Sequence, residues 1–309
     1  MFDYVIGIDG GGTKTLGVLY RIDGLEVKWV QLGFSNFSVD EAQAKSTLIT
    51  LIESLLKGLD LSRKVFIQMG IAGASRLSNK ESFIAYLESK FNCKAELDTD
   101  ALIALYSVDK RKGETPILAI GGTGSIVIIE KEQVVERIGG WGHLLGDEGS
   151  AYHLVIRAIK NIINEYELGQ GLGVLSQHLL NQMNLDDPKG IIDYVYNKPK
   201  SELALLSTEI QQVAKTDIFA KNLLMNEAKL LSSQIITAYK RFIKDEKVVI
   251  ALKGSFALKA LYVRETILED LKKQLPNVRM DEAGYEPVYG AYKLAKNKLY
   301  KEYNHGRYK

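Results

Sequence analysis

Two glycine-rich turns that each carry a threonine are the segments of this sequence best suited to chemistry. One lies within residues 9–15 and the other within residues 120–125, and β-rich runs flank both of them, as in a hairpin. Glycine allows backbone conformations in which several N–H groups point at one spot, where they bind an anion. Two such turns, one in each half of the chain, predict a site for a polyphosphate.

The first turn differs from two common nucleotide-binding motifs. A P-loop needs glycine and lysine side by side, whereas Thr13 separates Gly12 from Lys14. The dinucleotide fingerprint lies between a strand and a helix, whereas this turn lies between two strands. A purely structural tight turn stays open as an alternative for this segment taken alone.

Asp9 ends the apolar run before the first turn, beside the predicted phosphate site. A carboxylate there would repel a phosphate unless a cation lay between them. Mg²⁺ commonly binds in this way, to one or two carboxylates, to water and to phosphate oxygens. We therefore expect Asp9 to hold Mg²⁺ through water.

Asp100 lies where a predicted strand gives way to a helix that begins at Ala101. This position favours an N-cap, a role that aspartate fills well. The other role is that of a general base, which takes the proton of an attacking hydroxyl group. Both roles can hold at once. Asp98 is a second candidate, but it would point to the opposite face if the strand continued.

Within the segment 139–150, five glycines fall in the eleven residues 139–149, which favours a binding loop over a structural one. Trp141 is either a core aromatic residue or part of a pocket lining. We interpret His143 as a loop or packing residue, because no pair of His or Asp residues at ligand spacing accompanies it.

The elements that must position these residues predict an α/β architecture. Three β-rich runs open the chain, and strands then alternate with helices, which is typical of layered α/β folds. After the polar segment 110–116 the hairpin pattern restarts, and helical periodicity dominates from residue 151 to about 242. We therefore expect an N-terminal domain at residues 1–115 and a C-terminal domain at 116–290, with a helix at 291–309 that packs back on the first domain.

Composition excludes several classes of protein. Cys93 is the only cysteine, which excludes a disulfide scaffold and a cysteine-rich metal site within one chain. The 40 Lys and Arg residues against 38 Asp and Glu give no reason to expect nucleic acid as a partner. No stretch approaches the ~20 apolar residues of a membrane span. No signal peptide precedes the first strand, so we expect a cytoplasmic protein with no membrane partner.

Five segments, in order, resemble the sugar kinase–actin–heat-shock ATPase superfamily, and within it the N-acetylglucosamine kinases and the related BadF/BadG-type ATPases. The similarity runs from residue 5 to about 294. Its two phosphate motifs, two connecting segments and adenosine motif correspond to residues 9–15, 121–125, 98–101, 286–291 and 252–255. The resemblance implies a two-domain, actin-like (ribonuclease H-like) α/β fold. Each domain would be a mixed five-stranded sheet flanked by helices, with the nucleotide cleft between the domains.

The resemblance also implies roles for individual residues, and residues 139–152 look like the sugar-binding loop of N-acetylglucosamine kinases. Asp100 would be the catalytic base. The residues expected to bind ATP are Gly11, Gly12, Thr13, Lys14, Gly122, Thr123, Gly124, Ala214, Gly254, Ser255 and Lys259. Those expected to bind the sugar are Asn36, Gly73, Asp100, Gly140, Trp141, Gly142 and Asp147. Gly121 departs from the family, where serine is common, and residues 170–207 diverge too far for any role to be transferred.

The function that the resemblance implies is phosphorylation of the 6-hydroxyl of N-acetylglucosamine by ATP and Mg²⁺. N-acetylmuramic acid, glucosamine and other hexoses stay open as substrates, because a few contacts that the sequence does not reveal separate them. An ATPase that activates a partner enzyme is a second hypothesis, although Cys93 alone cannot supply the cluster ligands of those activators. A non-enzymatic sugar sensor is the third, and Asp100 with both phosphate turns argues against it. Relatives are often homodimers, so a homodimer is a further expectation.

Overall fold

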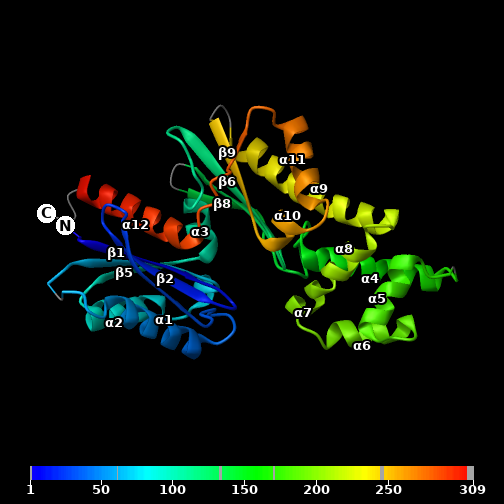
Figure 1. Ribbon diagram of the computed structural model, residues 1–309, viewed down its shortest axis with the longest axis horizontal. Helices are drawn as coiled ribbons and strands as arrows, with labels where there is room; N and C mark the ends of the chain where they lie inside the picture. Colours follow the sequence, from blue (N-terminus) through cyan, green and yellow to red (C-terminus); the bar gives the residue numbers. More distant parts are fainter. Residues whose placement is uncertain (1, 61, 132–133, 170, 244–246, 305–309) are drawn as a thin grey trace. The chain divides into compact units, whose positions relative to one another are not determined.

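The computed structural model describes residues 2–60, 62–131, 134–169, 171–243 and 247–304. The chain forms two compact units, Met1–Asp109 with Glu282–Lys309 (unit 1) and Lys110–Asp281 (unit 2). Each unit contains a mixed five-stranded sheet flanked by helices (Figure 1), which confirms the predicted α/β class. The division falls a few residues earlier than the expected one at both ends, because residue 114 already belongs to the sheet of unit 2.

The two sheets share one topology. In each, three antiparallel strands form a meander, and two further strands run parallel to the first of the three. In unit 1 the order is β3-β2-β1-β4-β5, with β1 (Tyr4–Gly10), β2 (Thr15–Arg21), β3 (Glu26–Leu32), β4 (Val65–Ile71) and β5 (Lys94–Asp98). In unit 2 the order is β10-β9-β6-β7-β8, with β6 (Glu114–Gly121), β7 (Ser125–Lys131), β8 (Val134–Gly139), β9 (Lys247–Lys253) and β10 (Arg279–Met280).

Helices cover both faces of the sheet in unit 1 (Figure 1). They are α1 (Glu41–Leu56) and α2 (Lys80–Phe91) on one face, and α3 (Asp100–Tyr106) and α12 (Pro287–Asn304) on the other, with a short 3₁₀ turn η1 (Ala74–Arg76). Because successive side chains of a strand point to opposite faces, Ile6 and Ile8 pack toward α1 and α2, whereas Val5 packs against α12. A strand buried on both faces has a continuous apolar sequence, which is why β1 and β4 are so strongly apolar.

Glycine allows α12 to pack closely on unit 1. A Cβ atom added to Gly7 would lie 2.6 Å from the carbonyl oxygen of Val288, and one added to Gly290 would lie 1.9 Å from that of Ile103. The axis of α12 therefore lies so close to β1 and α3 that only glycine fits at positions 7 and 290. Proline begins α12, where its missing N–H group leaves no intrahelical hydrogen bond unmade.

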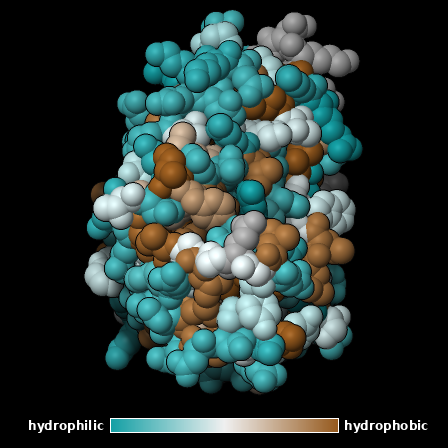
Figure 2. Space-filling view, turned by 90° about the vertical axis from the view of Figure 1, so that its right-hand side faces the viewer, coloured by the Kyte–Doolittle hydropathy of each residue, from teal (hydrophilic) through white to brown (hydrophobic). Residues whose placement is uncertain are grey.

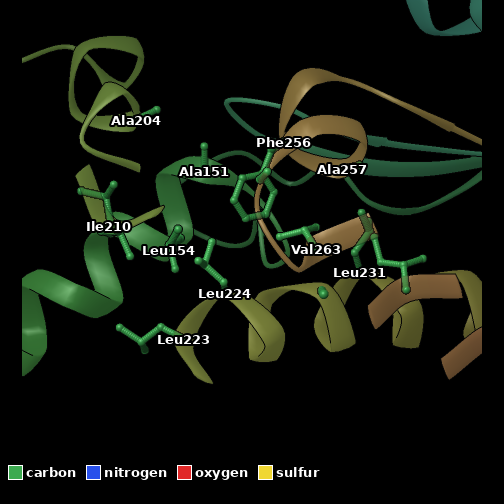
Figure 3. Close-up of a cluster of buried hydrophobic side chains, with 14 of the residues drawn as sticks. Ala151, Leu154, Ala204, Ile210, Leu223, Leu224, Leu231, Phe256, Ala257 and Val263 are labelled. Atoms are coloured by element: carbon green, nitrogen blue, oxygen red, sulfur yellow. The ribbon is translucent and has the colours of Figure 1, made fainter. Parts of the chain in front are cut away.

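Unit 2 is mainly helical between its third and fourth strands, as predicted. Its helices are α4 (Ala151–Glu167), α5 (Val174–Met183), η2 (Pro188–Gly190), α6 (Ile191–Tyr196), α7 (Lys200–Leu205), α8 (Ser207–Val213), α9 (Ile218–Phe242), α10 (Ser255–Lys259) and α11 (Val263–Gln274). The long helix α9 packs along β6, β7 and β8. Figure 3 shows side chains from α4, α8, α9, α10 and α11 meeting in one core, among them Leu154, Ile210, Leu224, Phe256 and Val263.

Several large apolar side chains of unit 2 are exposed. Figure 2 shows apolar residues gathered in patches on the face that lies to the right in Figure 1. The exposed residues between α4 and α7 are Tyr166, Leu168, Val174, Ile192, Tyr196 and Leu205. Within the part of the chain that the structure describes, no helix has the length and apolar character needed to cross a membrane.

An ion pair fixes the short edge strand β10 to β6. The guanidinium of Arg279 donates to the carboxylate of Glu114 from Nε over 3.0 Å and from Nη2 over 2.6 Å. These hydrogen bonds lower the pKa of Glu114 to about 2. The folded chain therefore binds fewer protons at Glu114 than the unfolded chain, whose pKa is near 4.5, and the pair stabilises the fold above that pH.

We predict that Glu114→Gln lowers the free energy of unfolding by about 1–3 kcal/mol at pH 7, because the variant loses the charged partner of Arg279. The difference from the wild type should shrink to half or less at pH 3, as the pH falls toward the folded pKa of Glu114. Urea unfolding at both pH values measures this effect. Glu269→Gln, on the exposed side of α11, is the control. An equal loss at both pH values would contradict a role for the carboxylate charge.

Candidate active site

The first glycine turn connects β1 to β2 and presents backbone N–H groups to solvent. The N–H group of Gly11 closes the turn by donating to the carbonyl of Lys14 over 3.1 Å. The amide groups of Gly12, Thr13 and Lys14 donate no hydrogen bond to any described residue, and all three residues are exposed. The turn therefore has the free donors that the sequence predicted for an anion site.

Two carboxylates lie at the edge of the sheet where this turn begins. Asp9 is next to last in β1, and Asp100 begins α3 two residues after the end of β5, so both lie at the carboxyl ends of parallel strands. Burial, followed by the negative charges of Asp100 and Glu286, raises the pKa of Asp9 to about 6, while Lys14 opposes this shift. Burial also raises the pKa of Asp100.

Thr99, rather than Asp100, is the N-cap of α3. The hydroxyl oxygen of Thr99 accepts a hydrogen bond from the N–H group of Leu102 over 3.2 Å. Asp100 occupies the first helical position, and its carboxylate accepts a hydrogen bond from the N–H group of its neighbour Ala101 over 2.9 Å. The expectation that Asp100 caps the helix is therefore wrong. The cap shifts by one residue because Thr99 has the extended backbone that a cap requires.

The residues around Asp9 fit a magnesium ion held mainly by water and phosphate. Three carboxylates (Asp9, Asp100 and Glu286) lie near enough for the last two to raise the pKa of the first, so a cation would relieve their repulsion. Among the described residues, no three His, Cys, Asp or Glu side chains form a ligand set for a metal. Asp9 with water and phosphate oxygens is a typical magnesium environment.

The structure brings Asn36 and Gly73 together beside the first turn. The side-chain oxygen of Asn36 accepts a hydrogen bond from the N–H group of Ser38 over 2.8 Å. A Cβ atom on Gly73, whose φ is +76°, would lie 3.0 Å from that oxygen. A Cβ atom on Gly12 would lie 4.0 Å from the amide nitrogen of Asn36. Two residues predicted to bind the sugar therefore adjoin one predicted to bind ATP.

A polar network beneath Asp100 was not predicted. The ammonium of Lys298, on α12, donates to Asp98 over 2.8 Å, to Gln68 over 3.1 Å and to Glu96. The amide of Gln68 donates to Asp98 over 3.0 Å. Asp98 therefore ties the end of β5 to α12, while the carboxylate of Asp100 makes no such pair. No local sequence signal links Lys298 to a residue 200 positions earlier.

The second glycine turn connects β6 to β7 and has the same character. The N–H group of Gly122 closes it by donating to the carbonyl of Gly124 over 2.9 Å, and the N–H groups of Thr123 and Gly124 donate to no described residue. The carbonyls of Gly122 and Thr123 accept from Ala151 and Tyr152, over 3.0 and 3.3 Å, so the first turn of α4 fixes the glycine turn in place.

The predicted adenosine motif contacts this second turn. Gly254 has a φ of +87°, and a Cβ atom added there would lie 2.4 Å from the carbonyl oxygen of Gly121. A Cβ atom on Gly121 would lie 2.9 Å from that of Ala257 in α10. The close packing of α10 therefore explains why glycine replaces the serine common in the family. Ser255 and Lys259 are exposed on α10.

Ala214 follows α8 and is buried in the core of unit 2. Its helix is tied to the end of α10, because the N–H group of Leu261 donates to the side-chain oxygen of Gln211 over 3.0 Å. Ala214, Ser255 and Lys259 thus lie in adjacent elements, but only the last two are exposed.

The loop that follows β8 exposes its large apolar side chains. Trp141 is 64% exposed, and the guanidinium of Arg137 stacks on its ring at 4.4 Å. Leu144 and Leu145 are more exposed still. The core interpretation of Trp141 is therefore wrong, because the positive φ values of Gly140 and Gly142 turn the loop away from the core, as a binding loop requires.

Buried polar contacts anchor the far end of this loop. Asp147 is only 4% exposed, with a φ of +68°. Its carboxylate accepts from the N–H group of Ser125 over 3.2 Å and pairs with the ammonium of Lys200. The fully buried carboxylate of Glu227, on α9, accepts from the N–H group of Gly149 over 2.8 Å. Neither Lys200 nor Glu227 was predicted, because both lie far from the loop in sequence.

The centroids of the His143 and Tyr152 rings lie 5.4 Å apart, in agreement with a packing role for His143.

A cavity of about 850 Å³ exists in unit 1, and it is lined by Phe2, Arg63, Lys64, Lys94, Lys296 and Tyr300 among others. It adjoins the first residues of β4 and β5, at the sheet edge opposite to Asp9. The cavity therefore lies apart from Asp9 and the first turn.

Comparison with known sequences gives a family match over almost the whole chain. The sequence profile of the BadF/BadG/BcrA/BcrD ATPase family matches residues 6–295. The N-acetylmuramic acid/N-acetylglucosamine kinase of Clostridium acetobutylicum is 31% identical over 304 residues, which cover 95% of this chain and 98% of the relative. The N-acetyl-D-glucosamine kinase of Dictyostelium discoideum is 27% identical, with 94% and 97% covered.

Solved structures with the same fold include sugar kinases. The structure of a proposed N-acetylglucosamine kinase from Chromobacterium violaceum has a TM-score of 0.72 at 21% identity, with 95% of this chain and 99% of the other covered. The ROK hexokinase of Thermus thermophilus has a TM-score of 0.59 at 16% identity, with 97% and 99% covered. At such identities these likenesses concern the fold alone. The profile match and the 31% identical relative go further, and this chain belongs to the BadF/BadG/BcrA/BcrD ATPase family.

Proposed function

We propose that this protein is an ATP-dependent kinase that phosphorylates the 6-hydroxyl of an N-acetylated amino sugar, N-acetylglucosamine first of all. The observation that carries the proposal is the carboxylate of Asp100, an exposed residue that lies near Asp9 and does not cap α3. The relative from C. acetobutylicum is named for two such sugars, so N-acetylmuramic acid is included among the acceptors.

Asp100 would act as the general base. Its carboxylate accepts the proton of the sugar 6-hydroxyl as the oxygen attacks the γ-phosphorus of ATP, and the bond to the β,γ-bridging oxygen breaks to release ADP. The raised pKa makes the carboxylate of Asp100 a stronger base than that of a free aspartate.

The two turns would position the phosphates. The free N–H groups of residues 12–14 and 123–124 suit the β- and γ-phosphates, because phosphoryl transfer depends mostly on positioning and charge stabilisation. Asp9 would hold Mg²⁺ through water, and the ion when bound neutralises phosphate charge. Ser255 and Lys259 are exposed on α10, where they would border the adenine. Ala214 is buried, so it would only pack behind the residues that contact the adenine.

The acceptor sugar would be held from both turn regions. Asn36 and Gly73 lie together beside the first turn, and the amide of Asn36 suits a sugar hydroxyl. In the loop after β8, Gly140 and Gly142 shape a surface from which Trp141 offers an exposed ring face, and Asp147 offers a carboxylate.

The chemistry of the Cys93 thiol supports the expectation that this chain does not bind the metal cluster of ATPases that activate a partner enzyme. Burial raises the pKa of this half-buried thiol to about 12, which disfavours the thiolate that a metal cluster needs. A homodimer, a cytoplasmic location and the lack of nucleic acid or membrane partners stay predictions. The exposed apolar residues between α4 and α7 offer a surface on which a second copy could pack.

The proposed activity is tested by ATP-dependent phosphorylation of N-acetylglucosamine, N-acetylmuramic acid, glucosamine, glucose and mannose in a coupled ADP-release assay. We expect turnover confined to the N-acetylated sugars, because the exposed loop around Trp141 resembles the amino-sugar loop. Hydrolysis of ATP without any sugar product would overturn the kinase and favour an ATPase that acts on a protein partner.

Asp100→Asn should lower kcat by about 10²–10⁴ with little change in ATP affinity, because the variant keeps the size of the side chain but loses the base. Steady-state kinetics and nucleotide binding measure the two effects separately. Asp186→Asn, at an exposed position with no hydrogen bond to a described residue, is the control. Turnover close to that of the wild type would refute the assignment of the base.

Asp9→Asn should stabilise the nucleotide-free protein at pH 7.5 by about 1–3 kcal/mol while impairing turnover. The folded pKa near 6 exceeds the ordinary 3.8, so the folded chain binds more protons and loses stability as pH rises from about 4 to 6. The asparagine side chain of the variant does not ionise, so this loss of stability is absent from the variant. Urea unfolding in EDTA at pH 5 and 7.5 measures this, again with Asp186→Asn as the control. A variant less stable than the wild type at pH 7.5 would contradict the repulsion around Asp9.

A further inference from the structure

The ammonium of Lys200 lies directly beside the second glycine turn. A Cβ atom added to Gly124 would lie 2.6 Å from the Nζ atom of Lys200 and 2.8 Å from the Oδ1 atom of Asp147. In the same turn, the N–H groups of Thr123 and Gly124 donate to no described residue. A positive charge and two free donors therefore adjoin one short segment of backbone, which is the chemistry that a phosphate group requires.

Lys200 is held there by a single carboxylate. Its ammonium pairs with Asp147, which is 4% exposed, whereas the Lys200 side chain is 28% exposed. The ring of Tyr152 lies 5.8 Å from the same ammonium. Asp147 would be an uncompensated buried charge without this partner, so the pair is needed when no ligand is present. A lysine ammonium on a flexible stem can also move to another anion, because it binds as a point charge.

We propose that Lys200 is a phosphate-contacting residue that exchanges partners. In the nucleotide-free chain its ammonium neutralises Asp147, and in the presence of ATP it binds the terminal phosphate at the second turn. The exchange frees the carboxylate of Asp147 to accept a hydrogen bond from a sugar hydroxyl. This inference rests on the proposed function, since it assigns ATP to the second turn and the sugar to the loop that contains Asp147.

The exchange couples the two substrates. A sugar hydroxyl that meets Asp147 before ATP binds must compete with the ammonium of Lys200, whereas after ATP binds it does not. ATP should therefore raise the affinity for the sugar, and by linkage the sugar should raise the affinity for ATP by the same factor. Lys200 lies in the part of the chain whose roles could not be transferred by resemblance.

The test is equilibrium binding by calorimetry, with AMPPNP and ADP as probes, in Mg²⁺ and without sugar. Lys200→Met should weaken AMPPNP binding by about 10–100-fold and ADP binding less, and Lys200→Arg should restore much of the loss. Lys198→Met is the matched control, because Lys198 pairs with Glu202 rather than with Asp147. Unchanged AMPPNP binding in Lys200→Met, or equal losses for AMPPNP and ADP, would overturn the proposal.

A second comparison separates phosphate contact from mere neutralisation of Asp147. In the Asp147→Asn background both members of the pair can be neutral, so Asp147→Asn with Lys200→Met avoids an unpaired buried charge. If Lys200 contacts phosphate, Lys200→Met still weakens AMPPNP binding at least tenfold in that background. If Lys200 only balances Asp147, the loss disappears there and the proposal fails.

The outcome is distinguishable from a failure of the proposed function, because these titrations need no sugar and no turnover. A wild-type protein that binds AMPPNP but phosphorylates no sugar would sink the kinase and leave the phosphate contact standing. A wild-type kinase whose Lys200→Met variant binds AMPPNP normally would sink this inference alone. A wild-type protein that binds no AMPPNP would sink both.

Discussion

Both turn regions depend on one constraint: several of their backbone N–H groups must form no hydrogen bond with another group of the protein. An N–H group in that state is tolerated only where solvent or a ligand reaches it, so the turns have to lie at a surface. The strands beside them obey the opposite requirement, since β1, β4 and β6 are apolar and pair on both sides. The exposed residues of each turn thus connect strands whose backbone is hydrogen-bonded on both sides, and this limits how far the turn can move.

The two turn regions share a topology but differ in charge. Asp9 precedes the last residue of β1, whereas Ile120 holds the equivalent place in β6. The first region therefore gathers carboxylates that repel one another, and the second gathers an ammonium beside its turn. Within the second region the charge of that ammonium is balanced by Asp147.

Local patterns in the sequence predicted both hairpins, most of the strands and the helical region of unit 2, but not the two-residue strand β10. Those features depend on periodicity and glycine, which act over a few residues. The partners of Asp98 and Asp147 could not be predicted, because Lys298 and Lys200 reach them only through the tertiary fold. The N-cap of α3 was missed by one residue, since Thr99 and Asp100 are both good caps and only backbone geometry separates them.

The return of α12 to unit 1 has a consequence for the order in which the chain folds during synthesis. Val5, Val18 and Phe66 form one face of the first sheet, and α12, made after unit 2, covers that face. Unit 2, by contrast, is continuous in sequence, so its core needs no segment that is made after residue 281. The first unit to be synthesised is therefore the last to be finished, and until then an apolar sheet face is open to chaperones and to aggregation.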